Sequence, residues 1–418
     1  MSIKLRLIIM NWLQFAVWGA YLTSMGGYLS RIGLGENIGW FYSVQGIVSI
    51  FMPALMGVVA DRWIQAQRLM GICHLVSALL MSYVGYQGLM LGDAVTFVDI
   101  FPVYTLAVAF YMPTLALSNS VSYTSLDKAG LDTVKNFPPI RIFGTIGFIV
   151  SMWIVDFMGI QHTSSQFFAS AAWGIMLGVY AFSLPQCTVN KTASTSLSDI
   201  FNLKSFALFK ESRMRMFFIF SMLLGVSLQI TNGYANPYIS AFSLDSSYSE
   251  AFFSEHANLL ISLSQISETL CILLIPVALR RFGIKSVMLM AMMAWVFRFG
   301  LFAIGDPMFP GVICFILSMI VYGIAFDFFN ISGSLFVDKE TDPSARSSAQ
   351  GLFMLMTNGL GATLGTLAAQ YVVNMYVYSE NEPSLIIEGW RTSWSIFAAY
   401  AACVCVLFAL LFKSRQAK

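Results

Sequence analysis

The sequence predicts an all-α membrane protein with twelve transmembrane helices in two groups of six. Three observations predict this fold class. Of the 418 residues, 57% are hydrophobic and only 11% are charged, a composition far from that of soluble domains. Twelve apolar windows approach or exceed the roughly 20 helical residues that cross a bilayer core. A single long polar stretch separates the first six windows from the second six.

The expected spans follow from the apolar windows taken in order. The first six cover residues 7–29, 39–60, 69–91, 96–123, 140–159 and 166–184. The second six cover residues 216–243, 257–279, 284–304, 309–337, 347–376 and 393–412. The domains expected from this pattern are an N-terminal half at 1–185, a cytoplasmic linker at 186–212 and a C-terminal half at 213–418. The first apolar run is too long for a cleaved signal peptide, so its helix is expected to remain.

The basic residues predict the orientation of the chain. With a cytoplasmic N-terminus, nearly all of the 23 Lys and Arg residues fall on the cytoplasmic side; Arg31 and Arg391 lie outside, and Arg298 lies within a span. This distribution follows the positive-inside rule and predicts cytoplasmic N- and C-termini. The opposite loops are mainly acidic. The net charge of +2 is therefore the sum of two biased faces and does not indicate nucleic-acid binding.

The cysteines and histidines give no sign of a metal or redox site. The six cysteines are scattered, without disulfide or metal-ligand spacing, and the three histidines are far apart in sequence. No nucleophile–base constellation is visible either. A membrane enzyme is therefore the least favoured function, and no cofactor or metal is expected.

One carboxylate, Asp327, lies deep within an apolar span. Tyr322, Phe326 and Asn330 follow one another at four-residue steps, which places them on one helix face with Asp327 at its edge. An ionised carboxylate at that depth is costly, so it usually faces a cavity, a partner or a proton path. The alternative is a hydrogen-bonded contact between helices that serves packing alone.

Three further spans carry polar groups on single helix faces. They contribute Arg141, Thr145 and Phe148 in the fifth span, Gln229 and Asn232 in the seventh, and Gln265 and Glu268 in the eighth. A single amide could be interhelical packing, and Arg141 could be a helix-end arginine that reaches the membrane surface. Together, the carboxylates, arginine, amides and aromatic rings match the hydroxyls and flat ring of a sugar-and-base ligand. A proline pair, Pro138-Pro139, is expected to open the fifth helix.

Short basic loops follow the second span of each half. The first reads Gly57-Val-Val-Ala-Asp61-Arg62-Trp63 and the second covers residues 279–285. Two six-helix halves with such loops resemble the major facilitator superfamily, whose halves rock about a substrate site near the bilayer midplane. By this resemblance, Asp61 and Arg62 are expected to act in gating. The alternative is that both loops are merely short and basic, as the positive-inside rule predicts, and have no role in gating.

A closer resemblance rests on residues 137–148, 228–232, 264–269 and 322–334, and covers almost the whole chain. These segments resemble the nucleoside:proton symporter family of the major facilitator superfamily. The resemblance implies uptake of nucleosides driven by the proton gradient, and the cell inner membrane is the expected location. Because stacking on aromatic rings tolerates many bases, we expect purine and pyrimidine nucleosides, such as uridine and adenosine, to be accepted. A monomer is expected. The resemblance also implies a substrate site lined by Arg141, Thr145, Phe148, Gln229, Asn232, Gln265, Glu268, Tyr322, Phe326 and Asp327.

The two membrane carboxylates are the expected proton-coupling groups. A low-dielectric environment disfavours the charged form of a carboxylate, so Glu268 or Asp327 is expected to bind and release the proton. The residues do not distinguish between the two. A proton-coupled sugar carrier or a drug exporter on the same fold remains the alternative function.

Overall fold

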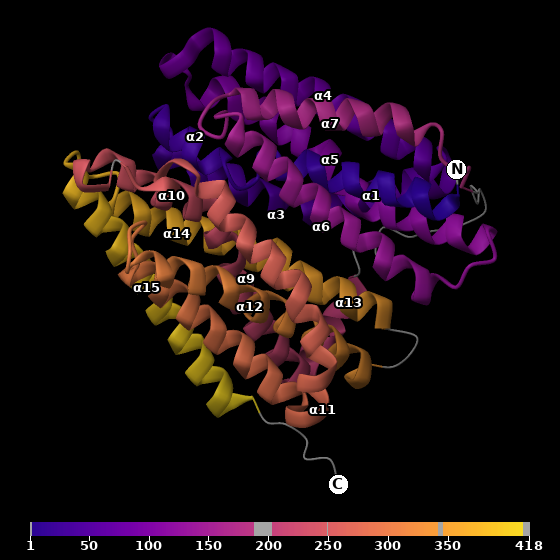
Figure 1. Cartoon of the computed structure of the whole chain (residues 1–418). Coiled ribbons are helices and arrows are strands. Elements are labelled where there is room, and N and C mark those ends of the chain that lie inside the picture. The colour runs from indigo at the N-terminus through magenta and orange to yellow at the C-terminus, as the bar shows by residue number, and fades with distance from the viewer. Residues whose placement is uncertain (1, 188–202, 249, 342–345, 413–418) are drawn as a thin grey trace. The chain divides into compact units, whose positions relative to one another are not determined.

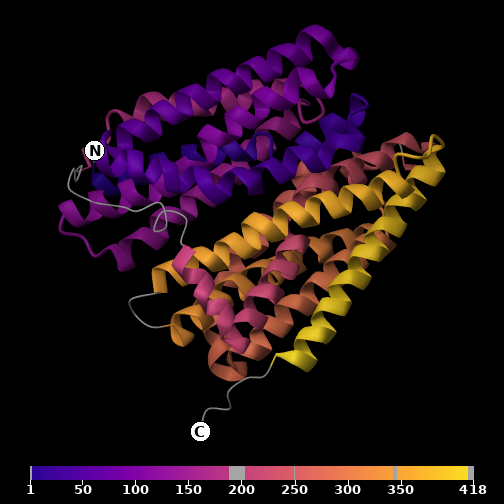
Figure 2. The same cartoon turned by 180° about the vertical axis from the view of Figure 1, so that it is seen from behind.

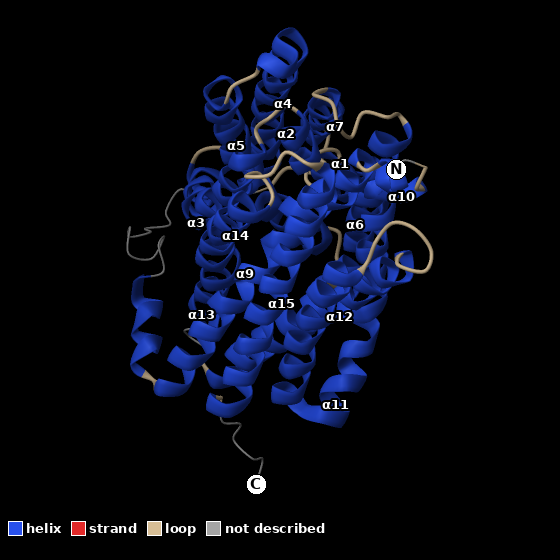
Figure 3. Ribbon diagram, turned by 90° about the vertical axis from the view of Figure 1, so that its left-hand side faces the viewer, coloured by secondary structure: helices blue, strands red, loops and turns tan. Residues whose placement is uncertain are grey.

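The computed structural model describes residues 2–187, 203–248, 250–341 and 346–412. Every regular element in these ranges is a helix (Figure 3). The chain divides into two compact units, Met1–Phe201 and Asn202–Lys418. Most of the linker expected at 186–212 lies outside the described residues, and its last part forms the short helix η3 (Leu203–Lys210). The all-α prediction is confirmed.

The described part of the N-terminal unit contains seven α-helices. Helix α4 packs against both α5 and α7, and α1 packs against α6 (Figure 1). In chain order they are α1 (Ile3–Gly19), α2 (Met25–Arg31), α3 (Ile38–Arg62), α4 (Ala66–Leu91), α5 (Phe97–Lys128), α6 (Thr133–Phe157) and α7 (Ser165–Ala181), with the short helices η1 (Gly35–Asn37) and η2 (Gly92–Ala94) between them.

The C-terminal unit is built around α11, which packs against α12 and α15 (Figure 2). After η3, its described elements are α9 (Ser212–Ala241), η4 (Phe242–Leu244), η5 (Ser246–Tyr248), α10 (Phe252–Glu255), α11 (Ala257–Ile304), α12 (Val312–Glu340), α13 (Arg346–Met354), the π-helix η6 (Leu355–Gly361), α14 (Ala362–Tyr376) and α15 (Pro383–Leu411).

Nine helical segments of the described chain are long and apolar enough to cross a membrane. One of them, α11, has 48 residues and covers the eighth and ninth expected spans. Its two parts meet at Gly283, where a φ of 74° breaks the helix in a conformation that glycine adopts readily. The two remaining expected spans fall on α1 followed by α2, and on the 17-residue helix α7. The described chain therefore contains all twelve predicted spans.

The first span is interrupted, contrary to the prediction of one continuous helix. Helix α1 ends at Gly19 and α2 begins at Met25. The hydroxyl of Tyr42 on α3 donates to the carbonyl of Leu22 and accepts from the amide of Gly26. Backbone groups freed by a helix break must find other partners in an apolar environment, and Tyr42 supplies them here.

The fifth span begins earlier than predicted. Helix α6 starts at Thr133, so Pro138 and Pro139 lie within the helix and do not open it. Arg141 is consequently in the helix interior and not at its first turn. Proline is tolerated within membrane helices when neighbouring groups satisfy the freed backbone.

Glycines bring α1 and α6 into close contact. A Cβ atom on Gly19 of α1 would collide with the backbone of Phe148, and one on Gly147 of α6 would collide with the backbone of Trp12. Small residues at such crossings allow the close backbone approach through which membrane helices associate. This packing sets the depth and rotation of the α6 face that carries Thr145 and Phe148.

Candidate functional site

Two aromatic rings one turn apart on α12 form a flat stack. The rings of Tyr322 and Phe326 are inclined by only 3°, with centroids 5.8 Å apart. Tyr322 is buried and Phe326 is half-buried. Beside them, Asp327 is 6% exposed, and its Oδ2 has no hydrogen-bond partner among the described residues. One face of α12 thus carries stacking rings next to a buried acid.

The first part of α11 lies very close to α12 at this point. A Cβ atom on Gly323 would be 2.6 Å from the carbonyl oxygen of Ser267, and the Ser267 hydroxyl donates to the carbonyl of Ile320. Glu268 follows Ser267 in the chain, and its side chain lies within electrostatic range of both Tyr322 and Asp327. The structure therefore brings together the two predicted membrane carboxylates and the Tyr322 ring.

The amides of α9 are paired with each other. Asn232 Nδ2 donates to Gln229 Oε1 over 2.8 Å, and Asn232 is half-buried. The nearby Asn236 has a different role, because its Nδ2 donates over 3.1 Å to Asn258 in the contact between α9 and α11. Gln265 is half-buried on α11, one turn before Glu268. Gln229 and Asn232 therefore present one joined pair of amides.

The predicted residues of the N-terminal unit lie along α6. The guanidinium carbon of Arg141 is 3.8 Å from the centroid of the Phe15 ring on α1, a cation–π contact. Thr145 is half-buried one turn later, and Phe148 is buried at the crossing with α1. Because Arg141 contacts α1 within the unit, it does not extend from a helix end in the way the alternative reading required.

A buried polar network in the same unit was not predicted as a site. Gln14 on α1 donates over 2.7 Å to Thr114 on α5, and its Oε1 is 2.8 Å from Nε2 of His74 on α4. The hydroxyl of Tyr111 donates to the Gln14 carbonyl over 2.9 Å. These bonds tie three helices together through groups that would be costly to bury without partners.

The predicted gating pair lies in the last turn of α3. Arg62 is the final residue of this helix. The side chain of Asp61 lies outside the described residues, so its gating role stays a prediction.

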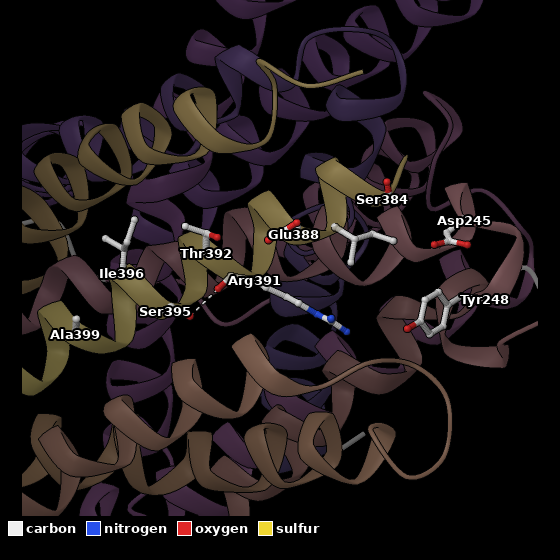
Figure 4. A pocket seen from close by; sticks show the side chains of 10 residues that line it. Asp245, Tyr248, Ser384, Glu388, Arg391, Thr392, Ser395, Ile396 and Ala399 are labelled. Atoms are coloured by element: carbon white, nitrogen blue, oxygen red, sulfur yellow. Dashed lines mark hydrogen bonds between the residues drawn. The ribbon is translucent and has the colours of Figure 1, made fainter. Parts of the chain in front are cut away.

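A pocket of about 710 Å³ lies on the C-terminal unit, along α15 and beside η5 (Figure 4). Arg391 points toward Tyr248, which lies beside Asp245 at one end of the lining residues, and Ile396 and Ala399 lie at the other end. None of the predicted site residues lines it. Its lining mixes charges of both signs with apolar surface, and it does not coincide with the α12 site.

The whole sequence matches one family of transporters. The family model for the nucleoside H⁺ symporter matches residues 1–417. The chain belongs to the nucleoside H⁺ symporter family. The function predicted from residues and resemblance is confirmed at this level, and this symporter is not an enzyme.

Named relatives agree with this membership. The symporter is 45% identical to the nucleoside permease NupG of Escherichia coli K12, covering 100% of this chain and 98% of the relative. It is also 45% identical to the xanthosine permease of the same organism, covering 99% and 96%. A crystal structure of the nucleoside transporter NupG matches with a TM-score of 0.89, covering 99% of this chain and 100% of the other.

A more distant structure shows the breadth of the fold. The xylose transporter XylE of E. coli superposes with a TM-score of 0.61 at 12% identity, covering 99% of this chain and 100% of that one. At such low identity the likeness concerns architecture alone. The symporter therefore has the predicted major facilitator fold.

One feature of the symporter's α12 site was not anticipated. Arg298, on the second part of α11, is 0% exposed and lies over the Tyr322 ring, with 4.5 Å between its guanidinium carbon and the ring centroid. The sequence placed Arg298 within a span but not in the site. A lone arginine in an apolar span is itself a functional signal, and it could have drawn attention to this residue.

Proposed function

We propose that this symporter carries nucleosides inward across the cell inner membrane together with protons. The observation that carries the proposal is the parallel Tyr322–Phe326 stack next to the interacting carboxylates Glu268 and Asp327. A flat aromatic surface suits a nucleobase, and a pair of membrane carboxylates suits proton binding. Family membership supports both halves of the reaction.

The C-terminal half is proposed to bind the base and the ribose. Tyr322 and Phe326 offer ring faces to the base, an interaction that is tolerant of base identity. Gln229, Asn232 and Gln265 offer amide donors and acceptors to the ribose hydroxyls. Asn232 and Gln265 are half-buried and so accessible to a ligand, whereas Gln229 is buried and is bonded to Asn232. This division predicts acceptance of both purine and pyrimidine nucleosides, including uridine and adenosine.

The N-terminal half is proposed to contribute Arg141, Thr145 and Phe148. The cation–π contact with Phe15 limits the freedom of the Arg141 side chain, so its remaining donors are held in a restricted direction. Thr145 offers a hydroxyl, and Phe148 offers another ring. Together they provide donors and an apolar surface of the kind that a nucleoside binds.

Glu268 and Asp327 are the proposed proton-coupling pair. Two carboxylates close together resist simultaneous ionisation, so the pair retains a proton more readily than either alone. Alternating access needs a ligand that interacts differently with the two states, and a proton on this pair would provide that difference. Asp61 and Arg62 are proposed to gate the cytoplasmic side.

The orientation proposed from the charge distribution places both termini in the cytoplasm. The symporter is proposed to act as a monomer.

The test uses right-side-out membrane vesicles that contain the symporter and an imposed pH gradient. Labelled uridine should accumulate when the outside is acidic, and a protonophore should abolish accumulation. In vesicles with the same expression level but no pH gradient, labelled uridine should reach only equal concentrations inside and outside. Uridine accumulation to the same level with and without the pH gradient would contradict proton coupling. The absence of uridine uptake would contradict the nucleoside assignment.

Competition in the same vesicles separates nucleosides from their parts. Adenosine should inhibit strongly and deoxyuridine more weakly, because an unpaired buried polar group costs roughly 1–3 kcal/mol, or about one to two decades of affinity. Uracil, ribose and uridine monophosphate should inhibit little, the last because its phosphate would meet two carboxylates. Strong inhibition by ribose alone would instead favour a sugar carrier.

A further inference from the structure

Arg298 carries a guanidinium in the interior of the C-terminal unit. Its Nε donates to the Thr231 hydroxyl over 3.3 Å, and its Nη1 donates to the Ser318 carbonyl over 2.7 Å and to the Ser264 hydroxyl over 3.3 Å. One side chain on the second part of α11 thereby reaches α9, α12 and the first part of α11. The Ser318 hydroxyl donates in return to the Arg298 carbonyl over 2.9 Å.

The charge of Arg298 has no carboxylate partner within the described part of the chain. It is surrounded instead by neutral oxygens and by two rings, Tyr322 at 4.5 Å and Phe302 at 5.4 Å from the guanidinium carbon. A fully buried cation without a counter-ion is costly, and apolar side chains would fill the same space at lower cost. Packing alone therefore gives a poor reason for an arginine here.

The contacts of Arg298 coincide with the neighbours of the proposed nucleoside-binding residues. Thr231 immediately precedes Asn232, and Ser264 immediately precedes Gln265. Tyr322 is itself a proposed base-stacking residue. Arg298 thus contacts each of the three helices that contribute to the C-terminal part of the site, at the level where each contributes.

We propose that Arg298 is a positioning residue for nucleoside recognition. It holds the Tyr322 ring in the plane that runs parallel to Phe326, and it sets the register of α9 and the first part of α11 against α12. The inference rests on the proposed role of Tyr322 in binding the base. It extends that proposal by assigning the preorganisation of the site to a residue that does not touch the nucleoside.

The physical reason is the loss of freedom that binding otherwise requires. A ring that rotates in the empty carrier must be ordered when the base arrives, and this ordering weakens binding. A desolvated cation–π contact can hold the ring beforehand. Without Arg298, uridine should therefore bind about tenfold more weakly through the disorder of Tyr322, although every proposed contact residue is still present.

The experiment is a double-mutant cycle on purified full-length symporter, with the Kd for uridine measured by equilibrium dialysis. Arg298→Gln should weaken binding about tenfold, and Tyr322→Leu should weaken it at least as much. The double variant should bind about as well as Tyr322→Leu alone, because Arg298 acts through the ring. Arg298→Lys retains the charge over Tyr322 and should recover part of the affinity. Arg215→Gln, the same substitution at an exposed position of α9, is the matched control and should bind as the parent does.

The outcomes separate this inference from the proposed function. The positioning role would be overturned if Arg298→Gln bound uridine as the parent does, or if the losses of uridine-binding free energy in the two single variants added up in the double variant. Neither result would contradict the proposed nucleoside site. Parent-like binding by Tyr322→Leu would overturn the proposed site, and the inference with it. A purely structural Arg298 would lower thermal stability in the variants without moving the Kd of the folded protein.

A further double variant covers the case in which Arg298→Gln does not fold. Thr231→Val with Ser264→Ala removes two hydroxyl acceptors and leaves the charge in place. This double variant should fold and bind uridine several-fold more weakly, since the guanidinium then loses two of its anchors. Unchanged affinity in this variant would refute the proposal.

Discussion

The rings of Tyr322 and Phe326 lie parallel on consecutive turns of α12, inclined by 3° with centroids 5.8 Å apart. Residues four apart on a helix share a face, but parallel rings also require matching side-chain torsions. The stack therefore presents parallel ring faces beside Asp327.

Loss of the Phe326 ring should weaken nucleoside binding without changing the substrate range. Base–aromatic stacking contributes about 1–3 kcal/mol, so Phe326→Ala should raise the Kd for uridine about tenfold or more. Phe326→Tyr keeps the ring and is the matched control. The Kd values are measured by dialysis for uridine and for adenosine. A stacking role would be refuted if Phe326→Ala bound each nucleoside with the same Kd as the parent.

Neutral replacements of the carboxylates should uncouple uptake from the proton gradient. Asp327→Asn and Glu268→Gln should each abolish accumulation of uridine against its gradient, because the amide cannot take up the transported proton. At least one of them should retain counterflow, which exchanges bound substrate without net proton movement. Asp338→Asn, on the same helix and about half-exposed, is the control and should accumulate uridine as the parent does. If both neutral variants accumulate uridine uphill, coupling through this pair is wrong.

A methyl group at Gly323 should disturb the contact between α11 and α12. A Cβ atom there meets the Ser267 backbone, which cannot move aside as a flexible side chain can. Overpacking of this kind costs about 1–3 kcal/mol, so Gly323→Ala should lower the melting temperature by several degrees and reduce uridine uptake. Gly300→Ala meets open space in the second part of α11 and is the control; it should leave the melting temperature unchanged or raise it slightly. Equal stability of the two variants would contradict the close approach.

Asp61→Ala should shift the symporter toward inward-facing states. This prediction rests on the loop sequence, which resembles a cytoplasmic gate that closes against a neighbouring helix of the same half. Cysteines placed in the cytoplasmic vestibule should react faster with a membrane-impermeant thiol reagent in Asp61→Ala than in the parent. Asp61→Glu retains the charge and should react at an intermediate rate. Equal reaction rates in all three proteins would argue against gating by Asp61.

His162 should not contribute to the pH dependence of uptake. It lies in the loop between α6 and α7, where partial burial and the nearby charge of Arg31 lower its pKa to about 4. A histidine with this pKa is neutral throughout the range from pH 5.5 to 8, so its protonation does not change there. His162→Gln should therefore show the same uptake-versus-pH curve as the parent, whereas a displaced curve would identify His162 as a titrating group.

The main features of the fold could be read from the sequence because apolar length is a local property. Each window of roughly 20 apolar residues predicts a membrane helix without reference to its neighbours. The observed helices differ from the predicted ones where a residue distant in the sequence supplies a contact. The break after Gly19 depends on Tyr42, whose hydroxyl supplies the bonds that the broken helix lacks. The prediction that Pro138 and Pro139 open the fifth helix was wrong, because α6 begins at Thr133 and continues through both prolines.

The candidate site divides in a similar way. The four-residue spacing of Tyr322 and Phe326 predicted a shared face, and the sequence identified both Glu268 and Asp327 as unusual groups in apolar spans. The family resemblance assigned both to one site, but spacing along the chain does not show how close they lie. Their proximity depends on Gly323, which lets α11 and α12 approach closely, and on the rotation of each helix about its axis.

By itself, the sequence determined that this protein is a helical membrane transporter and which ionisable groups lie within its spans, because the cost of placing a residue in lipid is set by its own side chain and its immediate neighbours. Only the tertiary structure decided which of those groups meet. Helices that are apolar on all sides show no periodic pattern that identifies the buried face. The partners of Arg298 on α9, α11 and α12 therefore emerge only when the three helices are packed together, since each contact joins residues far apart in the chain.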